Sequence, residues 1–258
     1  MSKDELLKKL KSNDKQEIRD AILELEKYEE SDVIKAIIDT IIENRAKQIL
    51  NAGIDVLLNF KNKKDEIAKN AIKLIFTDSP KLRHAGIDLL ISCGDYTIDI
   101  LEEKILKNQD YNIRKYGLDV LKEIKTERSL ELIEKLTNDE NPNVKYSAIE
   151  FLMNFTKFRD KVIKILKNVL KNESFDNLYG ATTIASTIIF GQFFDKTFIP
   201  ILREKLKLVK DDLIKHWIYK ILIYLKDIEI IEEAKENAKR VDMLNVIEND
   251  IELALNSK

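Results

Sequence analysis

Apolar residues recur along this chain at spacings of three and four positions, with polar residues between them. That spacing is the period of a helix that buries one face, and it continues from about residue 3 to about residue 255. The helices fall into pairs, and the second helices are predicted to begin near residues 14, 45, 79, 110, 141, 174, 211 and 240. The pattern therefore predicts about eight antiparallel helix pairs and an all-α fold.

A short phrase recurs near the start of these second helices. Its copies are Ile49–Leu57, Leu82–Leu90, Ile113–Leu121 and Val144–Leu152. The first residue of each copy is its anchor, and the last three anchors lie 31 residues apart, while the first lies 33 residues earlier. A repeat of that length is typical of a stacked array of helix pairs, in which each pair packs only on its neighbours.

The phrase has a defined set of core positions when it is placed on a helix that advances about 100 degrees per residue. Counted from the anchor, positions +4, +5 and +8 share the buried face, whereas positions +2, +3 and +6 lie opposite. Position +4 holds a small residue, which is Gly53, Gly86, Gly117 or Ala148. Glycine inside a helix is destabilising by about 0.5–1 kcal/mol relative to alanine. Its use at this position indicates that another helix approaches closely.

The residue after the anchor is basic in the last three copies, as Arg83, Arg114 and Lys145. Such a side chain is long enough to reach a polar residue six positions back, or the equivalent residue of the adjoining repeat. Asp139 has this relation to Lys145, and Thr77 and Asn108 are weaker versions of it.

These phrases resemble HEAT-like repeats, in which an Asp-x-x-Pro-x-Val-Arg-x-x-Ala pattern opens the second helix of each pair. The segment Asp139–Ala148 matches that pattern almost position for position, with Lys145 in place of the arginine. The resemblance covers residues 14–156 in good register and the remainder by period alone. It implies a right-handed α-solenoid with the second helices on the concave face, here as a single domain over residues 1–258. It also implies a binding scaffold more often than an enzyme.

The composition agrees with an all-helical protein, because charged residues make up 35% of the chain and only six residues are Gly and three are Pro. The net charge of −2 provides no overall attraction to nucleic acid or to a membrane surface. The single cysteine, Cys93, excludes an intramolecular disulfide and suits a reducing cytoplasm. No apolar run is long enough to cross a membrane, and the first residues lack a secretory signal.

Candidate chemistry is sparse. His84 and His216 are the only histidines, and neither has a cysteine or a second histidine near it in the sequence. HEAT-repeat metalloenzymes carry His–Glu pairs in several repeats, and this chain has none. Glycine-rich phosphate loops and nucleophile motifs are also absent. We therefore expect no catalytic residues, no metal and no cofactor, and we place both histidines on the exposed concave side.

Acidic residues recur at position +6, one in each copy of the phrase: Asp55, Asp88, Asp119 and Glu150. They form either a solubilising face or an acidic ridge along the groove. Tyrosines occupy neighbouring positions that should also be exposed, and these are Tyr116, Tyr146 and Tyr219, with Tyr179 as a further candidate. Exposed tyrosines on a concave surface favour binding, because each offers apolar area and a hydroxyl group.

Two further stretches stand out. Residues 177–194 contain no charged residue, and we interpret them either as a helix packed between repeats six and seven or as an exposed apolar floor for a ligand or second subunit. Basic residues run along two first helices, as Lys157, Lys161, Lys164, Lys167 and Lys171 and then Arg203, Lys207 and Lys210. Without interleaved aromatic residues, these favour a solvated convex face over a polyanion site.

The sequence thus predicts a non-enzymatic interaction scaffold that binds a protein or peptide, of basic character, in its concave groove. The candidate partner-binding residues are Asp88, Tyr116, Asp119, Tyr146, Glu150, Tyr179, His216 and Tyr219. One alternative is a DNA-binding protein that resembles the HEAT-like alkylpurine DNA glycosylases, which hold a duplex in a basic groove with Trp and Asp at the lesion. Trp217 at a core position and an acidic groove count against it. Another alternative is a nucleic-acid binder that uses the convex lysines. The partner's identity and the oligomeric state stay open.

Overall fold

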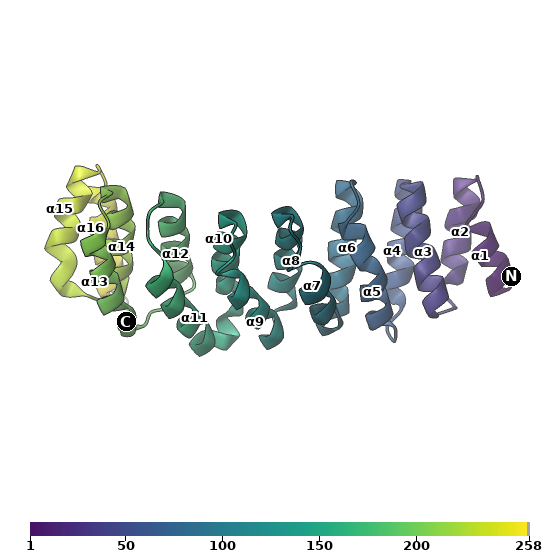
Figure 1. Ribbon diagram of the computed structural model, residues 1–258, viewed down its shortest axis with the longest axis horizontal. Coiled ribbons are helices and arrows are strands. Elements are labelled where there is room, and N and C mark those ends of the chain that lie inside the picture. The colour runs from purple at the N-terminus through teal and green to yellow at the C-terminus, as the bar shows by residue number, and fades with distance from the viewer. Residues whose placement is uncertain (257–258) are drawn as a thin grey trace. The chain divides into compact units, whose positions relative to one another are not determined.

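The computed structural model describes residues 1–256, and no strand occurs within them (Figure 1). The first helices of the pairs are α1 Lys3–Lys9, α3 Ser31–Asn44, α5 Lys64–Ile75, α7 Ile98–Lys104, α9 Glu127–Leu136, α11 Arg159–Asn172, α13 Ile199–Leu208 and α15 Ile231–Arg240. The second helices are α2 Lys15–Leu25, α4 Lys47–Asn59, α6 Pro80–Cys93, α8 Tyr111–Ile124, α10 Pro142–Phe151, α12 Leu178–Phe190, α14 Asp212–Tyr224 and α16 Leu244–Asn256. The chain is an all-α solenoid of helix pairs, as the periodicity predicted.

The predicted starts of the second helices are confirmed to within four residues, with α12 and α16 showing the largest deviations. The links that lead into later first helices contain short 3-10 helices, which are η1 Gly94–Thr97, η2 Leu152–Phe158, η3 Lys196–Phe198 and η4 Ile228–Ile230. Helix α10 ends at Phe151, just before the last residue of its phrase, Leu152. Phe155 leaves helical geometry, with φ −109° and ψ 37°, and its side chain is buried.

The chain divides into two compact units, of which the first is Met1–Ser129 and the second begins at Leu130. In the first unit, each of the second helices α2, α4, α6 and α8 packs on the next. In the second unit, α10, α12, α14 and α16 do the same. Helices α4, α6, α12 and α14 are therefore covered along both flanks by other second helices. The organisation of residues 1–258 as a single domain stays a prediction.

The small residue at position +4 has the predicted role. A Cβ atom added at Gly86 would lie 2.8 Å from Cβ of Leu74, in the first helix of the same pair. At Gly117 it would lie 2.7 Å from Cγ2 of Ile105. Contacts this short are closer than carbon atoms tolerate, so glycine is what allows α6 to approach α5 so closely.

The basic residue after the anchor links neighbouring segments. Nη1 of Arg83 donates to the backbone carbonyl oxygen of Thr77 at 2.8 Å, and Nη1 of Arg114 donates to that of Asn108 at 2.8 Å. Both acceptors lie six positions back, as predicted, although the bond goes to the backbone. Lys145 uses the other predicted route, because its Nζ lies 2.6 Å from Oε2 of Glu173 in the following pair.

The uncharged segment at residues 177–194 is in part interior and in part exposed. Ile184, Ala185 and Thr187 are fully buried where α12 packs between α10 and α14. Tyr179 and Phe190, near the two ends of α12, are 53% and 76% exposed. The absence of charge thus reflects burial on both flanks of the helix, and apolar surface is left at its ends.

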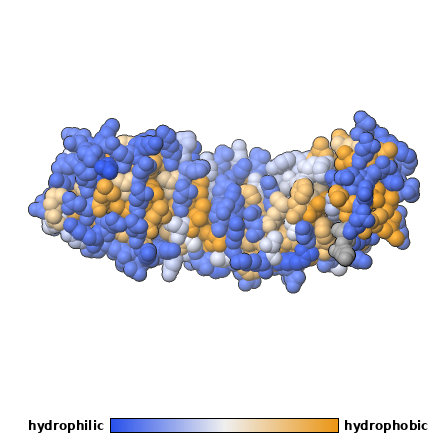
Figure 2. Space-filling view, turned by 180° about the vertical axis from the view of Figure 1, so that it is seen from behind, coloured by the Kyte–Doolittle hydropathy of each residue, from blue (hydrophilic) through white to orange (hydrophobic). Residues whose placement is uncertain are grey.

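Apolar side chains are also exposed elsewhere in the second unit. Leu208, Ile228 and Leu253 are 73%, 65% and 54% exposed. Figure 2 shows broad apolar areas on one face of this unit, at the right of the view. Within the described residues, no helix is long and apolar enough to cross a membrane.

Candidate binding groove of the first unit

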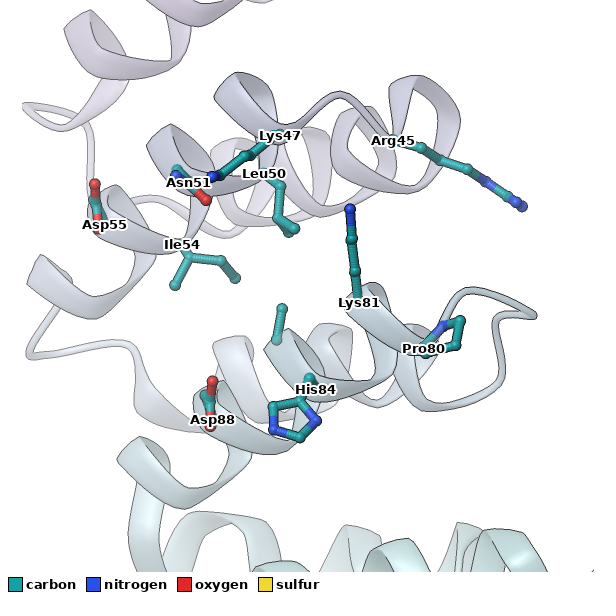
Figure 3. Close-up of a pocket in the computed structure, with 11 residues that line it drawn as sticks. Arg45, Lys47, Leu50, Asn51, Ile54, Asp55, Pro80, Lys81, His84 and Asp88 are labelled. Atoms are coloured by element: carbon teal, nitrogen blue, oxygen red, sulfur yellow. The ribbon is translucent and has the colours of Figure 1, made fainter.

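A groove of about 710 Å³ lies between α4 and α6 in the first unit (Figure 3). Its lining residues are Arg45, Lys47, Leu50, Asn51, Ile54, Asp55, Pro80, Lys81, His84, Ala85 and Asp88. They come from successive turns of both helices, so the groove runs along the helix direction. We call this feature the α4/α6 groove.

The floor of the α4/α6 groove is apolar. Leu50 and Ile54 of α4 are half-buried, and Figure 3 shows both side chains pointing into the space between the helices. Ala85 of α6 is 9% exposed. These residues stand at positions +1, +5 and +3 of their phrases, next to the buried anchors. A ligand in the groove would therefore cover apolar surface that the fold leaves open.

The charges of the groove are separated by sign along its length. Lys47 and Lys81 lie in the first turns of α4 and α6, and Arg45 precedes α4. Asp55 and Asp88 lie two turns further along the same helices. Both carboxylates are exposed and form no hydrogen bond or ion pair within the described residues. One end of the groove is therefore cationic and the other is anionic.

The expected partner-binding residues of the first unit all lie on second helices, and Asp88 belongs to the groove. On α8, Asp119 is half-buried and its Oδ1 accepts a hydrogen bond from Nζ of Lys122 at 2.9 Å. Tyr116 is also half-buried, and its ring centroid lies 5.5 Å from the guanidinium carbon of Arg83. These two residues are partly engaged within the fold, whereas Asp88 is free.

Three predicted residues of the second unit are buried, so the expected exposure is wrong for them. Tyr146, His216 and Tyr219 are 3%, 1% and 2% exposed. Neighbouring second helices cover Tyr146 and His216, at flank positions that would be exposed on an isolated helix pair, whereas Tyr219 lies against α15, the following first helix. Ala52, Ala85 and Ser147, all at position +3, are buried for the same reason.

The buried tyrosines bond to carboxylates. The hydroxyl of Tyr146 donates to Oε1 of Glu173 at 3.3 Å and accepts from Nδ2 of Asn177 at 2.9 Å. The hydroxyl of Tyr219 donates to Oε1 of Glu233 at 2.7 Å. Burial raises the pKa of both hydroxyl groups. These side chains join neighbouring elements and are not available to a partner.

The imidazole ring of His216 is buried, and its hydrogen bonding is incomplete. Burial, reinforced by the ammonium group of Lys220, lowers the pKa of His216, while Asp250 acts in the opposite direction. Its Nδ1 has no hydrogen-bond partner within the described residues. Within residues 1–256, no three His, Cys, Asp or Glu side chains are grouped as metal ligands would be.

The remaining predicted residues of the second unit are accessible. Glu150 is exposed on α10, and Tyr179 is 53% exposed at the start of α12. The ring of Tyr179 packs edge-on against Tyr146, with centroids 5.4 Å apart. Glu150 and Tyr179 belong to the second unit and do not line the α4/α6 groove.

Some of the basic residues on the first helices form ion pairs within the fold, and others are exposed. Arg203 forms a salt bridge with Asp227 at 2.5 Å and with Glu229 at 2.9 Å. Nζ of Lys161 lies 2.8 Å from Oε1 of Glu131. Lys157, Lys164 and Lys171 are exposed to solvent. This agrees with a solvated face.

Sequence reasoning missed the cationic end and the apolar floor of the groove. Lys47 and Lys81 precede their anchors by two residues and one residue, outside the recurring phrase. The available signal was a lysine in the first turn of a helix, where acidic residues are usual. Leu50 and Ile54 could not be separated from core residues by spacing alone.

Comparison with known proteins supports the repeat architecture. Residues 98–186 match the family model of HEAT repeats. The structure is similar to that of Kap95p, with a TM-score of 0.55 and 10% identity over 98% of this chain and 42% of that chain. An AP-3 complex chain gives a TM-score of 0.49 and 16% identity over 96% of this chain, and importin beta gives 0.43 and 10% over 98%. This chain spans 49% of the AP-3 chain and 41% of importin beta. No curated protein sequence matches it.

Proposed function

Since this chain is a HEAT-like repeat protein, we propose that it is an interaction scaffold whose α4/α6 groove binds a segment of a protein partner. Repeat solenoids present extended surfaces of stacked helices, which suit such partners. Kap95p, which has a similar fold, binds RanGDP. A partner of basic character is part of this proposal, because Asp55 and Asp88 are exposed and unpaired.

The observation that carries the proposal is the groove itself. It combines half-buried apolar side chains with unpaired carboxylates on two adjacent helices. Desolvation of Leu50 and Ile54 would supply affinity, whereas the exposed carboxylates would mainly set association rate and salt sensitivity. On α8, Tyr116 and Asp119 would extend the contact surface within the first unit. Glu150 and Tyr179 are candidate contacts of the second unit.

We assign the protein to the cytoplasm within this proposal. Cys93 is buried and is the only cysteine of the chain. Burial raises the pKa of its thiol to about 11, which keeps the thiol protonated and unreactive near neutral pH. A protein that depends on no disulfide suits a reducing compartment.

The test uses a fluorescein-labelled peptide in which lysine alternates with leucine and serine. We expect saturable binding by fluorescence anisotropy, which weakens as salt rises from about 50 to about 500 mM because exposed charges are screened. The double variant Asp55→Lys/Asp88→Lys should bind the peptide at least about tenfold more weakly. Glu232→Lys, an exposed reversal on α15, is the control and should bind like the parent. Equal binding by the double variant would show that the groove is not the site.

A further inference from the structure

The lysines of the α4/α6 groove are placed against the helix dipole. Lys47 is the first residue of α4, and Lys81 is the second residue of α6. The start of a helix carries a partial positive charge, which disfavours a cation there. Neither helix has an acidic residue in its first turn or a basic residue in its last turn. Fold stability therefore gives no reason for these two lysines.

Helices α5 and α15 follow the opposite rule. In α5, Asp65 and Glu66 lie in the first turn and Lys73 in the last. In α15, the first turn holds Glu232 and Glu233, and the last holds Lys239 and Arg240. Lysine also begins α2 and α5, as Lys15 and Lys64, but acidic residues in the same first turn offset it there. In α4 and α6, the two helices that form the groove, no acidic residue does so.

Lys47 and Lys81 are also left unpaired, although ion pairs between repeats are common nearby. Nζ of Lys73 lies 2.9 Å from Oδ1 of Asp39, and Nη1 of Arg45 lies 2.9 Å from Oδ1 of Asp78. Within the described residues, Lys47 and Lys81 form no ion pair or hydrogen bond. The caps of α4 and α6, Ala46 and Ser79, also lack the side-chain hydrogen bond that Asp14 and Asp110 provide to α2 and α8.

We propose that the α4/α6 groove selects a protein segment with an acidic side chain at one end and a basic side chain at the other, separated by an apolar residue. This inference rests on the proposed function and specifies its ligand. The acidic side chain lies between Lys47 and Lys81, the apolar residue covers Leu50 and Ile54, and the basic side chain lies between Asp55 and Asp88. Both charged ends of the groove are thereby neutralised.

The length of the groove sets the spacing within the segment. Lys47 and Asp55 are eight residues apart on one helix, which corresponds to about 12 Å along its axis. An extended chain advances about 3.3 Å per residue. The acidic and basic side chains should therefore be about four positions apart, with the apolar residue midway. Side chains two positions apart point to the same side of an extended segment, so all three would face the groove.

The experiment compares labelled peptides of one composition. In the matched peptide, glutamate and lysine lie four positions apart with leucine midway, in either chain direction. In the scrambled peptide, glutamate and lysine are adjacent. We expect the better matched direction to bind the full-length protein about three- to tenfold more tightly than the scrambled peptide, as measured by anisotropy. Replacing the glutamate of the matched peptide by alanine should weaken its binding by a similar factor.

A charge exchange makes the test specific. The variant Lys47→Glu/Lys81→Glu should bind the matched peptide about tenfold more weakly, and it should prefer the peptide in which lysine replaces glutamate. Because acidic residues suit the start of a helix, the same variant should have a Tm raised by about 1–4 °C. Loss of binding together with a gain in stability cannot come from misfolding.

The outcomes separate this inference from the proposed function. If Asp55→Lys/Asp88→Lys weakens binding but the peptide's glutamate and the two lysines of the groove have no effect, the selective ligand is wrong and the scaffold function stands. If the matched peptide does not bind at all, or binds the Asp55→Lys/Asp88→Lys variant equally well, both are overturned. If the Lys47→Glu/Lys81→Glu variant binds the peptide in which lysine replaces glutamate, both the selective ligand and the scaffold function are supported.

Discussion

Glycine at position +4 decides how closely the helices of a pair approach. At Gly86, an added Cβ would lie 2.8 Å from Cβ of Leu74, an atom held by its own backbone. At Gly53, the nearest atom would be Cδ1 of Ile41 at 2.5 Å, the end of a flexible side chain. The first contact can be relieved only by moving a helix, whereas the second can be relieved by rotating a side chain.

We therefore expect Gly86→Ala to lower the free energy of unfolding by about 1–3 kcal/mol. Gly53→Ala is the matched control. It should be less destabilising by about 1 kcal/mol or more. Rotation of the Ile41 side chain relieves the contact, and alanine then stabilises the helix relative to glycine. Urea unfolding of both variants measures the difference. If Gly53→Ala proved as destabilising as Gly86→Ala, the rigid contact at Leu74 would not be the cause.

At the scale of elements, α14 shows what stacking does to a second helix. It is packed against α12 on one flank and α16 on the other, so polar side chains at flank positions become buried. His216 is one of these, with its Nδ1 unsatisfied. Nearby, Lys220 forms a salt bridge with Asp250 at 3.0 Å, and the hydroxyl of Tyr224 donates to Oδ1 of Asp250 at 3.1 Å.

The buried histidine predicts a loss of stability in acid. The pKa of His216 in the folded protein is lowered from its ordinary value of 6.5, chiefly by burial. Below pH 6.5 the unfolded chain therefore binds more protons at this residue than the folded one does. The free energy of unfolding falls as the pH decreases from about 6.5. The slope contributed by one group is at most about 1.4 kcal/mol per pH unit.

Urea midpoints at pH 7.5 and 5.5 provide the measurement. His216→Phe should show a smaller loss between the two pH values than the parent protein does. The control is His84→Gln, which changes the other histidine of the chain, an exposed one. An equal reduction of the loss in this variant would show that the effect is not specific to His216. An unchanged loss in His216→Phe would assign the acid sensitivity to other groups, such as the carboxylates.

At the scale of the whole molecule, the second helices pack on their neighbours within each of the two units. Within the first unit, α2, α4, α6 and α8 form a continuous series of contacts, and the α4/α6 groove lies inside that series. In such arrays stability is close to a sum of repeat and nearest-neighbour contributions. The groove should therefore not require the later repeats.

We expect a fragment of residues 1–125 to remain helical by circular dichroism and to bind the matched peptide within about threefold of the full chain. Its Tm should be lower than that of the full protein, because terminal contacts are lost. The fragment carrying Asp55→Lys/Asp88→Lys is the control for specific binding. An unfolded fragment would mean that residues 1–258 fold as one cooperative unit, whereas a folded fragment that does not bind would place the site elsewhere.

The sequence by itself determined the repeat, the helix pairs and the core anchors, because these depend on spacing along a single helix. Leu82 and Val144 are buried as their spacing required, and Gly86 lies where a first helix comes close. The resemblance of Asp139–Ala148 to HEAT-like repeats was readable for the same reason. Each of these features recurs about every 31 residues, so the sequence contains several copies of it.

Only the tertiary structure decided which of the remaining positions reach solvent. Tyr146 contacts α12, His216 lies near Asp250 of α16, and Tyr219 bonds to Glu233 of α15, so each is buried by a neighbouring helix. No spacing within one helix carries that information. The same holds for the groove. Lys47 and Lys81 lie in different repeats, and the groove that they line with Asp55 and Asp88 exists only because α4 packs beside α6.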